Sequence, residues 1–348
     1  MTTNPVHSLT PRRLPEADVT AVFPRVDRYL DELLADYGPE YVHLRFPLRQ
    51  LIDRGRGTPH EFSLPLLVHA ALDGDPGPAV PIAAVHALWW RAANAFDDVA
   101  DGDAGPELYG MPSGTALTAA LECGYALPLR ALAGMPVPEP QRRQLVRDYL
   151  EGWTAASNGQ IGDLLNEPSR VDPDAVLGVY RHKSGAVYAM ACAMAARLAT
   201  GEDGAQDPPG PVAEWGRFGQ VLGMLAQLRN DEDDLRSGTF DDLRNGTATY
   251  LLVHLLNSAP ADRRSRALQL LEKAAECPAS REELHGLMRS PDVQRPYHAY
   301  VASLHQEAHT LLDTLAPSCP FGAALRDRVD AEVCFLPGQQ THTAHRPG

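Results

Sequence analysis

The chain has 348 residues, of which 44% are hydrophobic, so it can bury a large core, and it carries a net charge of −14 at pH 7. This negative charge argues against nucleic acid or an anionic membrane as the partner, because both are polyanions. Five widely spaced cysteines suggest neither a disulfide framework nor a zinc site, and with no signal peptide and no apolar stretch of membrane-spanning length we expect a cytoplasmic protein.

Residues 1–16 are polar and contain prolines, which is typical of a disordered leader. From residue 17 onward apolar residues recur every three or four positions, as at Val22, Val26 and Leu30, and clusters of Pro and Gly interrupt the pattern. No alternating apolar and polar run is long enough for a sheet. The sequence therefore predicts an all-α domain over 17–337, a bundle of about a dozen helices around a central apolar cavity, followed by a flexible tail over 338–348.

A first acidic cluster, Asp97-Asp98-Val99-Ala100-Asp101, ends a helix that is expected to begin near Pro81. Asp97 and Asp101 are one turn apart on the same face, where they can bind one hard cation. Carboxylates at a helix C-terminus are destabilised by the helix dipole, so a compensating cation is expected there. Taken alone, this cluster is equally consistent with a solvated helix end.

A second acidic cluster, Asn230-Asp231-Glu232-Asp233-Asp234, ends a helix expected over 212–235. Neither cluster has the alternating ligands and glycine of a calcium-binding EF-hand loop. Two such faces opposite each other would hold Mg²⁺ against a phosphate-bearing substrate. The predicted metal ligands, which are also predicted catalytic residues, are Asp97, Asp98, Asp101, Asn230, Asp231 and Asp234.

Three further segments complete a pattern with these clusters: Gly159-Gln160-Ile161-Gly162-Asp163, Lys183-Ser184, and the run from Asp242 to Thr249. In this order the five segments resemble the motifs of the trans-isoprenyl diphosphate synthase superfamily, which includes class I terpene synthases of the same fold. Asp97–Asp101 is similar to its first DDxxD motif and Gln227–Asp234 to its second, with asparagine in the first acidic place. The resemblance implies the isoprenoid synthase fold, a homodimer, three Mg²⁺ ions and an allylic isoprenyl diphosphate as substrate.

The resemblance also implies groups that bind the diphosphate and line the hydrocarbon pocket. Lys183 would be the catalytic point charge on the departing diphosphate. Other diphosphate-binding candidates adjoin the second cluster; they are Gln227, Arg229, Arg236 and Arg244. The pocket is predicted below the acidic faces, lined by Trp90, Ala93, Asn94, Gln160, Tyr180, Phe218, Gly219 and Leu222.

The chain departs from the superfamily where a second diphosphate should bind. His60–Leu64, ahead of Pro65, contains no Lys or Arg, and Leu108–Pro112 has no arginine pair. A diphosphate in a partly dry site needs cations, because its desolvation is otherwise not offset. Arg54 and Arg56 would substitute if the register differs.

We therefore expect a class I terpene synthase that ionises and cyclises a linear C15 or C20 allylic diphosphate. One alternative is a prenyltransferase, which either elongates the chain with relocated cations or alkylates an acceptor without a diphosphate. A second alternative is a catalytically silent partner subunit of an active prenyl synthase.

Overall fold

The computed structural model describes residues 19–54, 56, 59–100, 105–204 and 210–338. Within these ranges the chain is helical apart from connecting segments and one antiparallel hairpin of strands β1 (Glu107–Leu108) and β2 (Met111–Pro112). The predicted leader lies outside the described residues, as does the predicted tail beyond Gly338, so both stay predictions. No described helix is both long and apolar enough to cross a bilayer.

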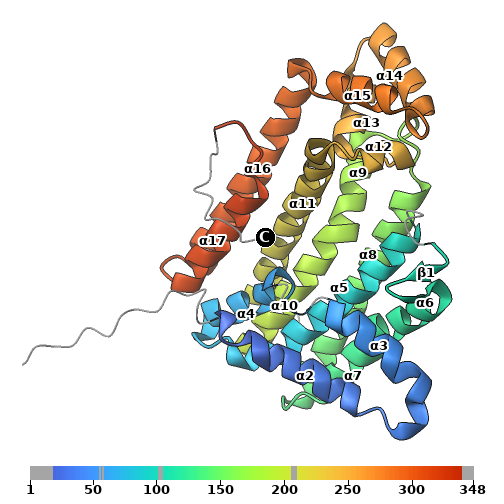
Figure 1. Cartoon of the computed structure of the whole chain (residues 1–348). Helices are drawn as coiled ribbons and strands as arrows, with labels where there is room; N and C mark the ends of the chain where they lie inside the picture. Colours follow the sequence, from blue (N-terminus) through green and yellow to red (C-terminus); the bar gives the residue numbers. More distant parts are fainter. Residues whose placement is uncertain (1–18, 55, 57–58, 101–104, 205–209, 339–348) are drawn as a thin grey trace, which may run out of the picture.

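The helices follow one another along the chain with short connections (Figure 1). The N-terminal third contains α2 (Phe23–Ala35), α3 (Val42–Arg54), α4 (Pro59–Asp73), α5 (Val80–Ala100), α6 (Ser113–Leu121) and α7 (Leu127–Ala133), with short helical turns η1 (Pro39–Tyr41), η2 (Gly77–Ala79) and η3 (Glu122–Ala126). The middle contains α8 (Glu139–Leu165), α9 (Pro173–Tyr180), the π-helical turn η4 (Arg181–Gly185), α10 (Ala186–Thr200) and α11 (Pro211–Ser237). The C-terminal third contains α12 (Asp241–Asn245), α13 (Tyr250–Ser258), α14 (Ala261–Ala274), α15 (Pro278–Met288), α16 (Pro291–Leu315) and α17 (Pro320–Glu332).

The predicted all-α fold with several long helices is confirmed. Helices α8 and α11 each have 27 residues, α16 has 25 and α5 has 21. Both acidic clusters begin in the C-terminal turns of long helices, α5 and α11, as their sequence context predicted.

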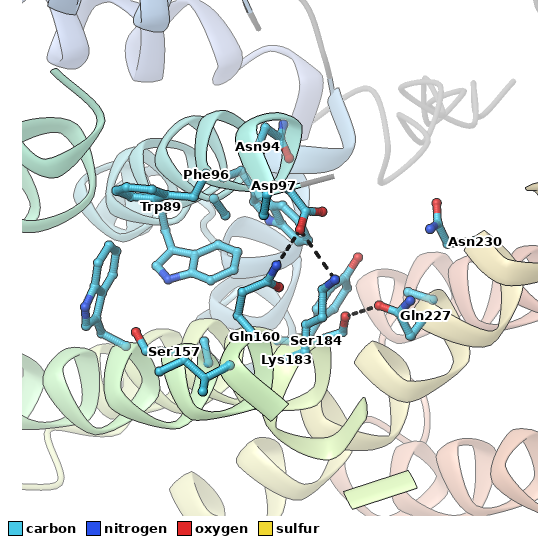
Figure 2. Close-up of a pocket in the computed structure, with 18 of the residues that line it drawn as sticks. Trp89, Asn94, Phe96, Asp97, Ser157, Gln160, Lys183, Ser184, Gln227 and Asn230 are labelled. Carbon is cyan, nitrogen blue, oxygen red and sulfur yellow. Dashed lines mark hydrogen bonds and ion pairs between the residues drawn. The ribbon is translucent and has the colours of Figure 1, made fainter. Parts of the chain in front are cut away.

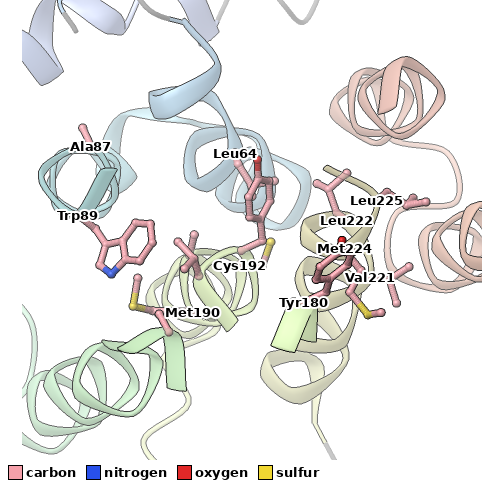
Figure 3. Packing of buried hydrophobic residues seen from close by; sticks show 14 of the residues in the cluster. Leu64, Ala87, Trp89, Tyr180, Met190, Cys192, Val221, Leu222, Met224 and Leu225 are labelled. Atoms are coloured by element: carbon pink, nitrogen blue, oxygen red, sulfur yellow. The ribbon is translucent and has the colours of Figure 1, made fainter. Parts of the chain in front are cut away.

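Helix α10 occupies the centre of the bundle, where it packs against α4, α5, α8 and α11. Its sequence is dominated by alanine, and small side chains allow neighbouring helices to approach closely from several sides. Figure 3 shows Met190 and Cys192 of α10 between Leu64 of α4, Trp89 of α5 and the α11 residues around Leu222. This packing forms one continuous hydrophobic core and holds α5, α8 and α11 around a common space.

Candidate active site

A cavity of about 640 Å³ opens between α5, α8, η4, α10 and α11 (Figure 2). Its walls are largely aromatic and apolar. Its polar groups come from the C-terminal parts of α5, α8 and α11 and from η4. The aromatic lining residues are Trp89, Trp90, Phe96, Trp153 and Tyr188. Trp90 makes edge-to-face contacts with Trp89 and with Tyr188, at ring-centroid distances of 5.0 and 6.0 Å. These contacts fix the ring orientations, so the apolar wall is preformed.

Lys183 lies at the polar end of the cavity, bound to carboxylates from two helices. Its Nζ is 2.7 Å from Asp163 Oδ2 on α8 and 3.4 Å from Asp97 Oδ1 on α5. Asp97 also accepts a hydrogen bond of 2.8 Å from Gln160 Nε2 (Figure 2). Among the described residues that line the cavity, Lys183 is the only Lys or Arg.

Two glycines explain how Lys183 reaches this position. A Cβ on Gly159 would lie 2.2 Å from the backbone N of Lys183, and a Cβ on Gly223 would lie 2.7 Å from the backbone O of Ser184. Helices α8 and α11 therefore both touch the backbone of the π-helical turn η4 directly. Such π-helical turns often occur at functional sites, and here the turn presents Lys183 to the acidic end of α5.

The second acidic cluster has one residue at the cavity and one buried behind it. Asn230 is exposed and lines the cavity from α11, across from Asp97 (Figure 2). Asp231 is buried, with 5% of its surface exposed, and accepts hydrogen bonds from the Tyr180 hydroxyl and from Gln227 Nε2, the latter at 3.0 Å. Burial raises the pKa of Asp231 to about 7, although both hydrogen bonds act to lower it.

The remaining predicted metal ligands are held by local partners. Asp98 accepts a hydrogen bond of 2.6 Å from the Tyr109 hydroxyl. Asp234 accepts one of 2.8 Å from the backbone N–H of Asp241 and therefore caps the start of α12. Asp101 lies outside the described residues. In the described part of the chain, the carboxylates of the two clusters do not form a group of three within 4.8 Å of one another.

The electrostatics of this end fit a bound cation. Asp242, at the start of α12, has its pKa raised to about 8, first by burial and then by the carboxylates of Asp231, Asp234 and Asp163. Burial is the main cause of both raised pKa values, and Lys183 lowers them only in part. Carboxylate and amide oxygens are the ligands that Mg²⁺ prefers, so the residues present fit this ion.

The arginines predicted to bind diphosphate do not line the cavity. Arg229 Nη1 is 3.4 Å from Glu332 of α17, Arg236 donates to a backbone carbonyl beyond α17 at 3.0 Å, and Arg244 pairs with its helix neighbour Asp241 at 2.8 Å. Gln227 does line the cavity, where its Oε1 accepts a hydrogen bond of 2.6 Å from Ser184. The structure thus leaves Lys183 and Gln227 as the diphosphate-binding candidates at the cavity.

Of the predicted pocket residues, Trp90, Ala93, Asn94 and Gln160 line the cavity, and the other four do not. Phe218 and Leu222 are fully buried in the core, and the Tyr180 hydroxyl is bound to Asp231. A Cβ on Gly219 would lie 2.4 Å from the backbone O of Tyr188. The space that the glycines of α11 leave is filled by the backbone of η4 and α10, because these helices pack directly on each other below Ala226.

Sequence reasoning did not assign site roles to Asp163 and Asp242, although both lie in the motif segments and this was the signal that could have identified them. It also did not place Trp153, Ser157 and Tyr188 in the pocket. Ser157 and Trp153 lie one and two turns before Gln160 on α8, so helical spacing from that motif could have identified them, whereas no motif lies within α10, which carries Tyr188.

Arg54 and Arg56 differ in what they contact. Arg56 is bound within an ion-pair network, 2.5 Å from Asp31 and 2.6 Å from Asp53. The Arg54 guanidinium instead lies 3.7 Å above the centre of the Tyr109 ring, and the hydroxyl of that same ring donates to Asp98. Arg54 therefore places a cation beside the first acidic cluster.

Comparison with known proteins identifies the family. The family model for polyprenyl synthetase matches residues 114–288. The chain belongs to the polyprenyl synthetase family. The match includes Gln160, Asp163, Lys183 and the second acidic cluster, whereas the first cluster precedes it and is linked to the site by the position of α5. No curated protein sequence matches this chain.

Solved structures share the fold of this family member over nearly its whole length. The geranylgeranyl pyrophosphate synthetase of Pyrococcus horikoshii is 18% identical, with 91% of this chain and 98% of that chain covered and a TM-score of 0.77. The decaprenyl diphosphate synthase of Rhodobacter capsulatus is also 18% identical, over 92% and 99% of the two chains, with a TM-score of 0.75. The farnesyl diphosphate synthase of T. brucei is 15% identical, over 94% and 100%, with a TM-score of 0.68. These likenesses confirm the isoprenoid synthase fold.

Proposed function

We propose that the protein is a Mg²⁺-dependent prenyltransferase that ionises a linear C15 or C20 allylic diphosphate and transfers the prenyl group to an acceptor. The observation that carries the proposal is a single cavity with an acidic end holding Lys183 and with aromatic walls behind it. Family membership supports prenyl transfer over the cyclisation expected from the sequence.

The acidic end would perform the ionisation. Asp97 and Asp98 on α5, with Asn230, Asp231 and Asp234 on α11, are the residues that would hold Mg²⁺. When bound, Mg²⁺ neutralises charge on the departing diphosphate. Lys183 donates a charge-assisted hydrogen bond to a diphosphate oxygen, and Asp163, 2.7 Å from its Nζ, fixes the direction of the ammonium group.

The aromatic walls would protect the allylic cation. Trp89, Trp90 and Tyr188 line the cavity, and Trp90 contacts the other two rings edge to face. Aromatic faces attract a cation without reacting as nucleophiles, and the apolar surface excludes the water that would quench it. The hydrocarbon chain occupies this part of the cavity.

The acceptor is proposed to be a second diphosphate, because Arg54 lies beside the first acidic cluster. Cyclisation remains the second candidate function. It is favoured by the scarcity of basic side chains, since Lys183 is the only Lys or Arg in the described cavity lining. A homodimer and a cytoplasmic location are also part of the proposal.

The deciding experiment is product analysis. Purified protein is incubated with geranyl, farnesyl or geranylgeranyl diphosphate and Mg²⁺, with and without isopentenyl diphosphate, and products are identified by mass spectrometry. We expect longer linear diphosphates only when isopentenyl diphosphate is present. A cyclic hydrocarbon formed without it would establish the second candidate instead. Absence of diphosphate release from every substrate would overturn both and favour the silent partner subunit.

A further inference from the structure

A cluster of two histidines and one aspartate lies between α16 and α17, away from the cavity. These helices form the left-hand edge of the bundle in Figure 1, whereas α5 and α8 lie toward the other side. Among the described residues, His305, His309 and Asp330 form the one group of three such side chains whose ligand atoms all lie within 4.8 Å of one another. None of the three lines the cavity.

The geometry of the cluster is that of ligands around one point. His305 and His309 are one turn apart on α16, so their rings share a face. Asp330 reaches them from α17, and its Oδ1 is 2.7 Å from Nε2 of each ring. The two Nε2 atoms are 3.1 Å apart. The three side chains thus meet through the atoms that coordinate metals in proteins.

Without a metal, both imidazoles can donate their Nε2–H to Asp330 Oδ1, because a carboxylate oxygen accepts two hydrogen bonds. The same three atoms can bind one metal ion when each neutral imidazole carries its proton on Nδ1 instead. A metal ion accepts all three lone pairs at once. Metal–ligand bonds of about 2.0–2.1 Å at angles of about 90–109° give ligand separations of about 2.8–3.4 Å. The N–N distance of 3.1 Å lies in this range, and the two N–O distances of 2.7 Å need to lengthen by only a few tenths of an ångström when a metal replaces the hydrogen bonds.

The ligand types select the metal. Two imidazoles and one carboxylate suit Zn²⁺ and neighbouring transition metals, whereas Mg²⁺ prefers oxygen ligands only. The side chains of His305 and His309 are 19% and 22% exposed and that of Asp330 is 47% exposed, so an ion can enter from solvent and water can complete its coordination.

We propose that His305, His309 and Asp330 form a Zn²⁺ site that links α16 to α17, independent of the diphosphate site. The link matters because α17, the last helix among the described residues, contacts α4, α11 and α16. Arg328 of α17 donates to Ser63 of α4 at 2.6 Å, and Glu332 pairs with Arg229 of α11. A metal ion bound by both α16 and α17 stabilises the position of α17.

The test uses the full-length, tag-free protein, stripped with a chelator and then titrated with Co²⁺ and with Zn²⁺. Excess Mg²⁺ in every titration competes for the oxygen ligands of the acidic clusters. We expect about one equivalent of Co²⁺ with visible absorption bands, displaced by Zn²⁺, and a higher melting temperature with Zn²⁺. Either His309→Gln or Asp330→Asn should weaken binding about tenfold or more.

Matched controls separate metal binding from folding. His298→Gln changes another histidine of α16, and Asp313→Asn breaks the 2.9 Å ion pair with Arg326 that also joins α16 to α17. Both should bind Co²⁺ as the unchanged protein does, and far-ultraviolet circular dichroism checks the fold of every variant. The proposal is overturned if the unchanged protein binds no Co²⁺ in excess Mg²⁺, or if a folded His305→Gln/His309→Gln double variant binds it equally well.

Discussion

Substitution of Gly159 by alanine should disturb the site without changing any polar side chain. The added Cβ would lie 2.2 Å from the backbone N of Lys183 and 2.7 Å from the carbonyl carbon of His182. Because ordinary contact begins near 3.4 Å, α8 and η4 must separate by about 1 Å, and a close-packed interior resists this. Overpacking of this kind costs about 1–3 kcal/mol, which lowers the melting temperature of a chain of this length by roughly 1–4 °C.

The same displacement moves Lys183 relative to Asp97 and Asp163. A misplacement of about 1 Å costs about 100-fold in rate, so kcat/KM for diphosphate release should fall by that order. The matched control is Gly178→Ala in α9, where a Cβ meets nothing within 4 Å; it should keep full activity and gain stability. The reasoning is refuted if Gly159→Ala melts within about 1 °C of the unchanged protein and retains its rate.

Three further outcomes are expected. Lys183→Met should lower the rate of diphosphate release about 100- to 1,000-fold, and a loss under about tenfold would contradict its role. Arg54→Gln should raise KM for isopentenyl diphosphate while KM for the allylic substrate stays unchanged, whereas Arg56→Gln should alter neither; equal effects of the two variants would remove Arg54 from the acceptor site. In Mg²⁺-free protein, Asp231 and Asp242 have folded pKa values of about 7 and 8 against 3.8 when unperturbed, so they retain protons that the unfolded chain loses. The free energy of unfolding should therefore fall as pH rises from about 4 to 8; added Mg²⁺ should restore it most at pH 8, and Asp231→Asn with Asp242→Asn should flatten the slope.

The positions of the acidic clusters could be predicted because they depend on local structure. The spacing within Asp97–Asp101 and within Asn230–Asp234 places side chains relative to their own helix, and the two helices are long and strongly patterned. The direction of Lys183 also followed from its motif. What the motif did not convey is the reason, which is the close contact of η4 with Gly159 and Gly223.

The failures concern contacts between helices. Gly219 looks like free space in the sequence, yet α10 fills that space with its backbone. Arg229 adjoins the second cluster along the chain but lies on the side of α11 that faces Glu332 of α17. Asp234 caps α12 because the chain reverses direction after Gly238, whose φ is 78°. This reversal brings the backbone N–H of Asp241 within hydrogen-bond distance of the Asp234 carboxylate. The periodicity of one helix shows which of its side chains share a face, but it does not show which other element packs against that face, so it could not reveal these contacts.

The choice between prenyl transfer and cyclisation depends on whether a cation is available for a second diphosphate. The hairpin of β1 and β2 carries Tyr109, in a left-handed turn with φ of 58°, to a position between Asp98 and Arg54. An exposed guanidinium gains only about 0.5–1 kcal/mol from an aromatic face, whereas each hydrogen bond to a charged group contributes about 1.5–3 kcal/mol. A diphosphate arriving beside the first cluster can therefore draw Arg54 away from Tyr109 with a net gain. Arg56 would first have to leave Asp31 and Asp53. Among the described residues the Arg54 guanidinium contacts an aromatic ring instead, so Arg54 is the better suited of the two to bind the acceptor.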